Sequence, residues 1–248
     1  MSISIIIPCY NYEKLLTQKY LKLKNIIKKI DNKFEIIFIN DGSTDNTLKK
    51  LKLLRKKDKK IKILSNNVNQ GKSFSLISGI KKSKYEKIII YDCDLPYLNY
   101  FKRVVKNLNN YPFVYINRKS KESRLNSKLL NSYQIIRFLI GRLICFIINF
   151  TCLSLKTGDT QAGLKAFIKP KKFKKIKFLS KKFFFDAEIM IIFHGLNKKM
   201  KNIPIKYSVP KDSTIKIFEF KNFIYLYELF KVIIFYKLKD LKKYERFF

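Results

Sequence analysis

Short runs of β-branched and aromatic residues alternate with longer amphipathic stretches through the first 117 residues. The runs SIIIP, EIIFIN, IKILS, KIIIYD and FVYIN predict strands, and helical apolar spacing predicts helices near 13–30, 44–57, 70–82 and 98–109. Strands that alternate with helices predict an α/β fold with a mostly parallel sheet covered on both faces. In such sheets ligands bind beyond the carboxyl ends of the strands, which here are the loops PCYNYE, NDGSTDN, SNNVNQGKS and DCDLPY.

The regular alternation ends after residue 117. A polar basic loop, NRKSKESRLNSK, precedes a long apolar helix, then TGDTQAGLKAF, a Phe-rich helix FFFDAEIMIIFHG and a strand KNIPIKYSV. We interpret 1–216 as one domain with two halves, 1–117 and 118–216. Residues 217–248 are expected to form a basic amphipathic C-terminal helix.

Two apolar segments, 134–155 and 217–244, are candidates for membrane contact. Arg137 and Arg142 interrupt the first and leave a charge-free run only from 143 to 155, while Glu or Lys breaks the second every few residues. Because a span needs roughly 20 apolar residues, we expect no transmembrane span. Both segments are interpreted as amphipathic helices that pack on the core or lie in a membrane interface.

The formal net charge of +36 favours a polyanionic partner, either nucleic acid or an anionic membrane surface. A coding bias towards Lys in an AT-rich genome is the competing explanation, since only seven of the 54 cationic residues are Arg. That bias does not explain why four of the seven lie between 118 and 142. The four cysteines form no CxxC pair, which argues against a zinc site or disulfide framework and fits a reducing cytoplasm. The N-terminus, MSISIIIPCY, lacks the basic region of a signal peptide.

Asp41 follows the second predicted strand in FINDGSTDNT. Ser43 and Thr44 can cap the next helix, so Asp41 is either part of this turn or a ligand contact that faces the crevice. The loop NNVNQGKS fails the Walker A spacing because Asn66 stands where a Gly is needed. Lys72 could still meet a phosphate from this loop.

Asp92 and Asp94 flank Cys93 at the end of the fourth predicted strand. In extended geometry their side chains point to the same side, and they raise one another's pKa unless a cation lies between them. Oxygen ligands of this kind suit Mg²⁺ or Mn²⁺ that bridges to substrate phosphates. The alternative is that Asp94 caps the helix that Pro96 helps to begin.

The motifs IIIPCYN, NDGSTDNT, NQGKSFSLISG, YDCDLPY, INRKSKESR, DTQAGLKAF and FFFDAEIM occur in the order and approximate spacing of family 2 glycosyltransferases. Over residues 3 to 216 the chain resembles, more narrowly, the dolichyl-phosphate and polyprenyl-phosphate hexose synthases. The resemblance implies a GT-A, Rossmann-like fold with a mostly parallel central sheet flanked by helices, and amphipathic interface helices in the C-terminal half. Residues 1–117 would then bind the nucleotide sugar and 118–216 the acceptor.

The resemblance also implies roles for individual residues. The donor nucleotide would be bound by Pro8, Tyr10, Asn11, Asp41, Lys72 and Asp92. Asp92 and Asp94 match the DxD pair that holds Mg²⁺ or Mn²⁺ and the donor diphosphate. The catalytic and acceptor side would comprise Asp94, Arg118, Arg124, Asp159, Gln161 and Asp186, the last in the FDxE helix with Glu188. Pro96 replaces a Gln that relatives often carry, and VPKDSTIK departs from their pattern at Ser213 and Lys216.

These matches imply an inverting transfer of a hexose from a UDP- or GDP-sugar to a polyprenyl phosphate. Arg forks would bind the lipid phosphate, which is already anionic and needs no strong general base. The enzyme would be cytoplasmic and peripherally attached to the inner face of a membrane, with no nucleic acid as partner. One alternative is transfer to a sugar hydroxyl of a surface polysaccharide, with Asp186 or Asp159 as base. Another is a non-catalytic basic protein that binds nucleic acid or lipid.

Overall fold

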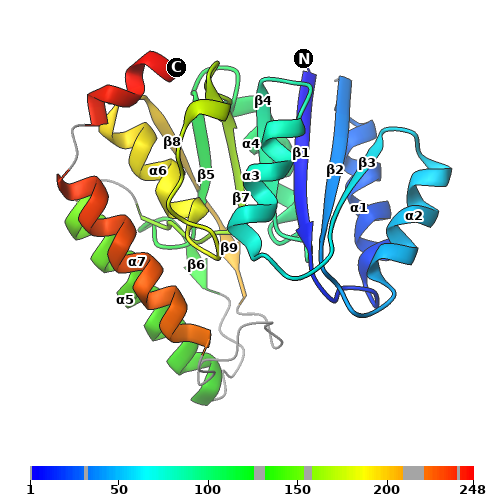
Figure 1. Ribbon diagram of the computed structural model, residues 1–248, viewed down its shortest axis with the longest axis horizontal. Helices are drawn as coiled ribbons and strands as arrows, with labels where there is room; N and C mark the ends of the chain where they lie inside the picture. The colour runs from blue at the N-terminus through cyan, green and yellow to red at the C-terminus, as the bar shows by residue number, and fades with distance from the viewer. Residues whose placement is uncertain (1, 31–32, 126–131, 154–157, 209–220, 239–240) are drawn as a thin grey trace.

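The computed structural model describes the chain except residues 1, 31–32, 126–131, 154–157, 209–220 and 239–240 (Figure 1). Its main sheet has the strand order β3-β2-β1-β4-β7-β5-β8, and a small second sheet pairs β6 with β9. The strands are β1 (Ser2–Cys9), β2 (Lys33–Asp41), β3 (Ile61–Asn66), β4 (Lys87–Tyr91), β5 (Phe113–Asn117), β6 (Arg124–Leu125), β7 (Leu164–Ile168), β8 (Met200–Pro204) and β9 (Lys206–Tyr207). The α-helices are α1 (Leu16–Lys28), α2 (Thr47–Lys57), α3 (Lys72–Lys82), α4 (Phe101–Asn107), α5 (Ser132–Cys152), α6 (Phe185–Gly195) and α7 (Lys221–Leu238). Short 3-10 helices are η1 (Leu98–Tyr100), η2 (Phe173–Lys175) and η3 (Leu241–Phe247).

The alternation predicted for the first 117 residues is confirmed. Strands β3, β2, β1 and β4 pair in parallel, so the chain segments that follow β1, β2 and β4 emerge at one edge of the sheet. The chain moves from β1 through β2 to β3 on one side and returns to β4 on the other. This makes β1 and β4 the point at which the strand order reverses, where open α/β sheets bind ligands.

One strand of the main sheet was not predicted. β7 lies antiparallel between β4 and β5 and thus inserts a segment from the second half into the middle of the sheet. Its sequence, LKAFI, is only five residues long and carries Lys165 among apolar neighbours. The spacing of its apolar residues therefore gives only a weak indication of a strand. The sheet remains mostly parallel, as predicted.

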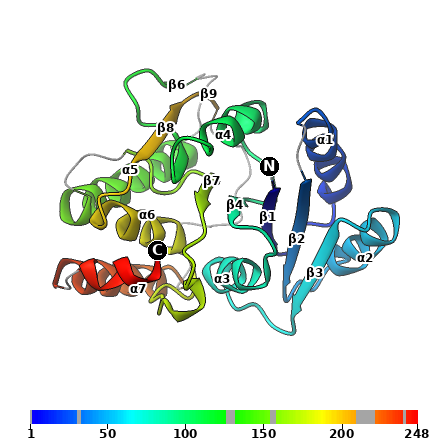
Figure 2. The ribbon, with the colours of Figure 1, turned by 90° about the horizontal axis from the view of Figure 1, so that it is seen from above.

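Two layers of helices cover the sheet (Figure 2). Alternate side chains of each strand point to opposite faces, so Ile5 and Ile7 pack with α1, α2 and α4, whereas Ile6 packs with α3, α6 and α7. Complete burial of one such Ile side chain contributes roughly 1.5–3 kcal/mol. These two cores fix the strand ends against which the candidate site is built.

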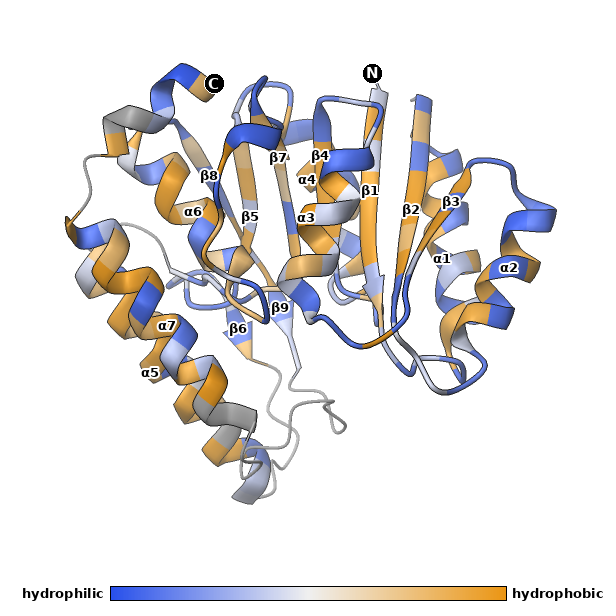
Figure 3. Ribbon diagram, viewed as in Figure 1, coloured by the Kyte–Doolittle hydropathy of each residue, from blue (hydrophilic) through white to orange (hydrophobic). Residues whose placement is uncertain are grey.

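Helices α5 and α7 lie side by side along one flank of the molecule, and both consist largely of apolar residues (Figures 1 and 3). Phe146 and Phe150 of α5 are 58% and 66% exposed, and Phe230 of α7 is 63% exposed. Within the described residues, α5 is long and apolar enough to cross a membrane by length and composition, which by itself is weak evidence of a span. The prediction that segment 134–155 cannot span a membrane because of Arg137 and Arg142 is therefore not supported by length and composition.

The C-terminal helix was predicted at 217–248 and is observed as α7 followed by η3. The predicted boundary at 216/217 and the loop VPKDSTIK with Ser213 and Lys216 lie outside the described residues.

Candidate active site

The loops that follow β1 and β2 are joined by hydrogen bonds at the carboxyl edge of the sheet. Asn11 has a φ of 47°, its backbone N–H donates to Ser43 Oγ (3.1 Å), and its Oδ1 accepts from the Thr44 backbone N–H (2.9 Å). The prediction that Ser43 and Thr44 cap the next helix is wrong, since α2 begins at Thr47. Both residues instead hold Asn11. Pro8, the second-last residue of β1, is half-buried and Tyr10 is exposed next to Asn11, so these three predicted residues do lie together at one strand tip.

The Asp41 carboxylate is buried at the end of β2 and points into the loop that precedes α3. Its Oδ1 accepts from Asn66 Nδ2 (2.8 Å) and the Gln70 backbone N–H (3.0 Å), and its Oδ2 accepts from the Gly71 N–H (2.9 Å). Asp41 thus sets the conformation of the loop that leads into Lys72. Gly71 has a φ of 104°, and a Cβ there would meet the Lys182 backbone at 2.7 Å, which explains the Gly.

Asp92 and Asp94 lie in the turn that follows β4. The sulfur of Cys93 lies 2.6 Å from that of Cys9 at the end of β1, both as free thiols, so the turn packs directly against the first strand tip. Pro96 stands between Leu95 and Tyr97, whose φ values are 49° and 61°. Helix α4 begins only at Phe101, and η1 has no side-chain cap. The alternative role of Asp94 as a helix cap is therefore wrong.

Lys72, at the start of α3, bridges Asp92 and the FDxE helix. Its Nζ lies 2.6 Å from Asp92 Oδ1 and 2.8 Å from Asp186 Oδ2. The other carboxylate oxygen of Asp186 lies 2.9 Å from Nζ of Lys165, a fully buried lysine of β7 that also donates to the Ala162 carbonyl (2.6 Å). Burial raises the pKa of Asp186, but Lys165 and Lys72 outweigh this and hold the pKa below its usual value. Burial lowers the pKa of Lys72, but the charges of Asp186 and Asp92 outweigh this and raise it.

The resulting chain of charges, Asp92–Lys72–Asp186–Lys165, joins β4, α3, α6 and β7. The sequence had assigned Lys72 to the donor phosphates, and the structure places it beside Asp92 in ion pairs. Lys165 was missed because it is one of many lysines, although a Lys inside the apolar strand LKAFI is a signal of a buried partner. Gly163 was also missed. The Asp92 N–H donates to its carbonyl (2.9 Å), and a Cβ at Gly163 would overlap the Asp92 carboxylate.

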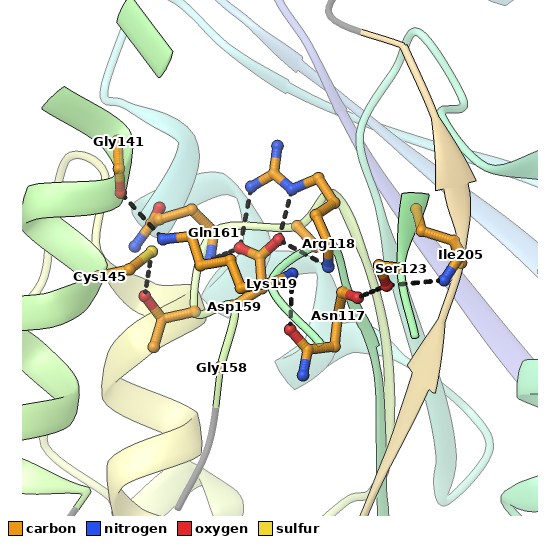
Figure 4. Close-up of polar contacts among 12 residues, drawn as sticks. Asn117, Arg118, Lys119, Ser123, Gly141, Cys145, Gly158, Asp159, Gln161 and Ile205 are labelled. Atoms are coloured by element: carbon orange, nitrogen blue, oxygen red, sulfur yellow. Dashed lines mark hydrogen bonds and ion pairs between the residues drawn. The ribbon is translucent and has the colours of Figure 1, made fainter. Parts of the chain in front are cut away.

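Arg118 and Asp159 form a bidentate ion pair beyond the end of β5 (Figure 4). Arg118 Nη2 donates to Asp159 Oδ1 (2.9 Å), and Arg118 Nε donates to Asp159 Oδ2. Burial raises the pKa of Asp159, but the Arg118 charge outweighs this and lowers the pKa below its usual value. A guanidinium has five N–H donors, of which this pair uses two, and the Tyr97 hydroxyl also interacts with Arg118.

Gln161 lies beside this pair, on the segment that leads from Asp159 to Lys165. Its backbone N–H donates to Asp159 Oδ1 (3.0 Å), and its buried Nε2 has no hydrogen-bond partner within the described part of the chain. Residues 159–165 therefore connect Arg118 to Lys165. Arg124 is not brought into this group. Its backbone pairs β6 with β9 and its side chain is exposed.

Glu188 of the FDxE helix points away from Asp92. Its carboxylate accepts from the backbone N–H groups of Leu179 (2.7 Å) and Ser180 (2.9 Å) and from the Tyr236 hydroxyl (2.7 Å). Burial raises the pKa of Glu188 to about 7, even though these hydrogen bonds lower it. Only Asp186 of this motif faces the charged chain.

The donor set at Asp92 and Asp94 fits a hard divalent cation. Burial and the Asp92 charge raise the pKa of Asp94 to about 6, although Lys19 and Lys72 oppose this, so a cation beside the pair would relieve an unfavourable repulsion. Across the described residues no group of three or more His, Cys, Asp or Glu forms a protein-only site. A cation here would need additional oxygen ligands from water and phosphate, which is the usual environment of Mg²⁺.

A hollow of about 350 Å³ lies between this site and helix α5. It is lined by Lys119, Arg142, Leu143, Cys145, Phe146, Asn149 and Gly158. Lys119 Nζ donates to the Gly141 carbonyl of α5 (3.2 Å), and Asn149 Nδ2 donates to the Gly158 carbonyl next to Asp159 (2.9 Å). A larger hollow of about 760 Å³ lies between α1 and α2 at the opposite end of the strands, far from these residues.

The sequence model for glycosyl transferase family 2 matches residues 4–181 of this chain. The chain belongs to that family. Among curated relatives, the uncharacterized glycosyltransferase sll0501 of Synechocystis is 32% identical over 145 residues, which are 58% of this chain and 45% of that protein. The dolichyl-phosphate beta-glucosyltransferase ALG5A of Trichomonas vaginalis is 25% identical over 230 residues, 87% of this chain and 68% of that protein. The match to the Synechocystis protein thus covers a little under half of that protein's length.

Among solved structures, glucosyl-3-phosphoglycerate synthase of Mycobacterium tuberculosis in complex with UDP has a TM-score of 0.65 at 15% identity. The match covers 94% of this chain and 80% of that chain. The same synthase has also been solved with Mn²⁺, UDP and glucosyl-3-phosphoglycerate. At this identity the likeness establishes the fold, which is GT-A as the sequence predicted.

Proposed function

We propose that this family 2 glycosyltransferase moves a hexose from a UDP- or GDP-sugar to a polyprenyl phosphate at the cytoplasmic face of a membrane. Relatives named for dolichyl phosphate and undecaprenyl phosphate support this acceptor class. The observation that carries the proposal is the hollow beside Asp159, which has cationic and apolar walls and opens towards the exposed apolar helix α5.

On the donor side, Asp92 and Asp94 would hold Mg²⁺ or Mn²⁺ together with the donor diphosphate. The metal, when bound, supplies positive charge to stabilise the nucleoside diphosphate as it leaves. Lys72 orients Asp92 through its ion pair, and Asp41 fixes the loop that carries Lys72. Pro8, Tyr10 and Asn11, at the neighbouring strand tip, would bind the nucleotide base.

On the acceptor side, the phosphate would approach the Arg118 guanidinium, whose side chain is 29% exposed beside Asp159. Lys119 and Arg142 line the hollow next to them, and Leu143 and Phe146 extend it along the apolar face of α5. A phosphate with an isoprenoid chain matches both walls, because guanidinium forks bind phosphate oxygens and apolar surface buries the chain. Gln161 Nε2 is a further donor in this region. Arg124, exposed on β6, would contact the acceptor only outside this group of residues.

A phosphate acceptor also agrees with the charge state of the predicted bases. Transfer to a sugar hydroxyl would require Asp159 or Asp186 to take a proton. The pKa of each is lowered, by Arg118 for Asp159 and by Lys165 and Lys72 for Asp186, even though burial raises it. Carboxylates held in this way are poor bases at neutral pH. A phosphate monoester is already anionic and needs only to be positioned.

Attachment to the membrane would use α5 and α7. Both helices carry exposed apolar side chains, among them Phe146 and Phe150 of α5 and Phe230 of α7, which suits burial at the boundary of headgroups and acyl chains. The positive charge of the chain favours the anionic inner leaflet. This arrangement would bring the hollow beside Asp159 to the surface where a lipid phosphate resides.

Donor binding is tested by thermal unfolding in the presence of nucleotide sugars. UDP- or GDP-sugar with Mn²⁺ is expected to raise the melting temperature, since a ligand at 100 times its Kd adds about 2.7 kcal/mol to stability. The rise should be absent without Mn²⁺ and in Asp94→Ala. A protein that binds only nucleic acid or lipid would show no such rise with any nucleotide sugar, and that result would overturn the proposal.

A further inference from the structure

Glu228 is a buried carboxylate on α7, a helix that otherwise carries mainly apolar side chains. The residue is 7% exposed. A buried charge is costly unless it is paired or hydrogen-bonded. Glu228 accepts from the Ser180 hydroxyl, from the Lys182 N–H (3.0 Å) and from the Phe183 N–H (3.2 Å). The side chain therefore crosses from α7 to the segment 179–183 and satisfies its donors.

The segment 179–183 has no helix or strand of its own, and carboxylates hold its shape. Glu188 accepts the N–H groups of Leu179 and Ser180, while Glu228 accepts those of Lys182 and Phe183. Backbone donors that would otherwise be buried without partners thus point into two carboxylates. Removal of Glu228 would leave the second half of the segment without acceptors.

The opposite side of the segment binds the first turn of α3. The Ser73 N–H donates to the Lys182 carbonyl (3.0 Å), and the Phe74 N–H donates to the Lys181 carbonyl (2.9 Å). The Ser73 hydroxyl lies 2.8 Å from that of Ser180. The segment thereby takes the place of an N-terminal cap for α3. Lys72, the first residue of α3, carries the amine between Asp92 and Asp186.

We propose that Glu228 is a positioning residue for the active site, which acts through segment 179–183 and the first turn of α3 to hold Lys72 between Asp92 and Asp186. Glu228 belongs to α7, which also carries exposed apolar side chains. The position of α7 on the domain is thereby coupled to the geometry of Asp92 and Asp94. The inference about kinetics rests on the proposed transferase function. The inference about position does not, and it has its own measurement.

The position is measured by hydrogen exchange in Glu228→Gln, with the exposed Glu245→Gln as the matched control. The glutamine keeps the size of the side chain but removes the charge and presents an NH₂ group to backbone donors. Exchange of the Ser73 and Phe74 amides is expected to rise about tenfold in Glu228→Gln and to stay unchanged in Glu245→Gln. Unchanged exchange in a folded Glu228→Gln protein would overturn the proposal. If that variant does not fold, Ser180→Ala should give the same change to a smaller extent, and no change there would overturn it equally.

The kinetic consequence is measured by a double-mutant cycle with Lys72→Met. Glu228→Gln is expected to lower kcat about tenfold in the wild-type background and less than about twofold in the Lys72→Met background, since its effect passes through Lys72. A purely structural contribution would lower kcat by the same factor in both backgrounds, and that result would refute the positioning role. If the wild type shows no transfer at all, the proposed function fails while the exchange result still decides the role of Glu228.

Discussion

Replacement of Lys165 by Met is expected to lower the free energy of unfolding by about 3–5 kcal/mol, the usual cost of removing one partner of a buried ion pair. Lys165 is fully buried and its amine lies 2.9 Å from Asp186. The methionine fills a similar volume, so the loss would come from a buried carboxylate that keeps Lys72 but has lost Lys165, rather than from a cavity. Urea unfolding at pH 7 measures the difference. Lys102→Met, on the exposed face of α4, should change stability by less than about 0.5 kcal/mol.

The same experiment at lower pH tests the electrostatic cause. Lys165 and Lys72 lower the folded-state pKa of Asp186 against the opposing effect of burial, so its contribution to stability is fully present above the unfolded pKa of about 4. This contribution is lost as the pH falls through the folded pKa. The gap between wild type and Lys165→Met should therefore shrink below about pH 4. A gap that stays constant down to acid unfolding would indicate packing as the cause instead.

Replacement of Asp92 by Asn is expected to reduce hexose transfer at least about a hundredfold, equivalent to about 2.7 kcal/mol in the activation free energy. The amide keeps the shape but weakens the interaction with both the cation and Lys72. Steady-state kinetics over a range of Mn²⁺ concentrations measure the effect, and higher Mn²⁺ should restore only part of the rate. The melting temperature should change little, because Asp92 is partly exposed and Asp186 still pairs with Lys72.

Glu122→Gln, which alters an exposed carboxylate outside the site, is the control for the Asp92 variant. It should transfer hexose at the wild-type rate. An Asp92→Asn enzyme as active as this control would show that the DxD carboxylate is not needed for transfer, whatever the family of the chain.

The strand tips could be predicted because apolar runs of regular spacing define parallel strands and their carboxyl ends. Asp41, Asp92 and Asn11 follow such runs, and the structure brings their loops to the same edge of the sheet. The antiparallel strand β7 could not be predicted in the same way, since its short apolar pattern is broken by Lys165. The partner that explains this lysine, Asp186, is 21 residues away in sequence.

The ion pairs of the site also could not be predicted from the sequence. Arg118 and Asp159 were both assigned to the site, yet nothing in their spacing of 41 residues indicates a bidentate ion pair. Ser43 and Thr44 have side chains that can cap a helix. They form hydrogen bonds with Asn11 instead, because the loops after β1 and β2 meet in the fold. Pro96 remains distinctive. It sits between two non-glycine residues with positive φ, a costly backbone that gives this DxD turn its own shape.

The central claim is tested most directly by offering the purified protein a labelled UDP- or GDP-hexose with Mn²⁺ and vesicles that contain either polyprenyl phosphate or the corresponding polyprenol. We predict labelled glycolipid with polyprenyl phosphate and none with polyprenol, and for Asp92→Asn a rate with polyprenyl phosphate at least about a hundredfold lower. Transfer to a saccharide hydroxyl but not to polyprenyl phosphate, across the UDP- and GDP-sugars, would contradict this account.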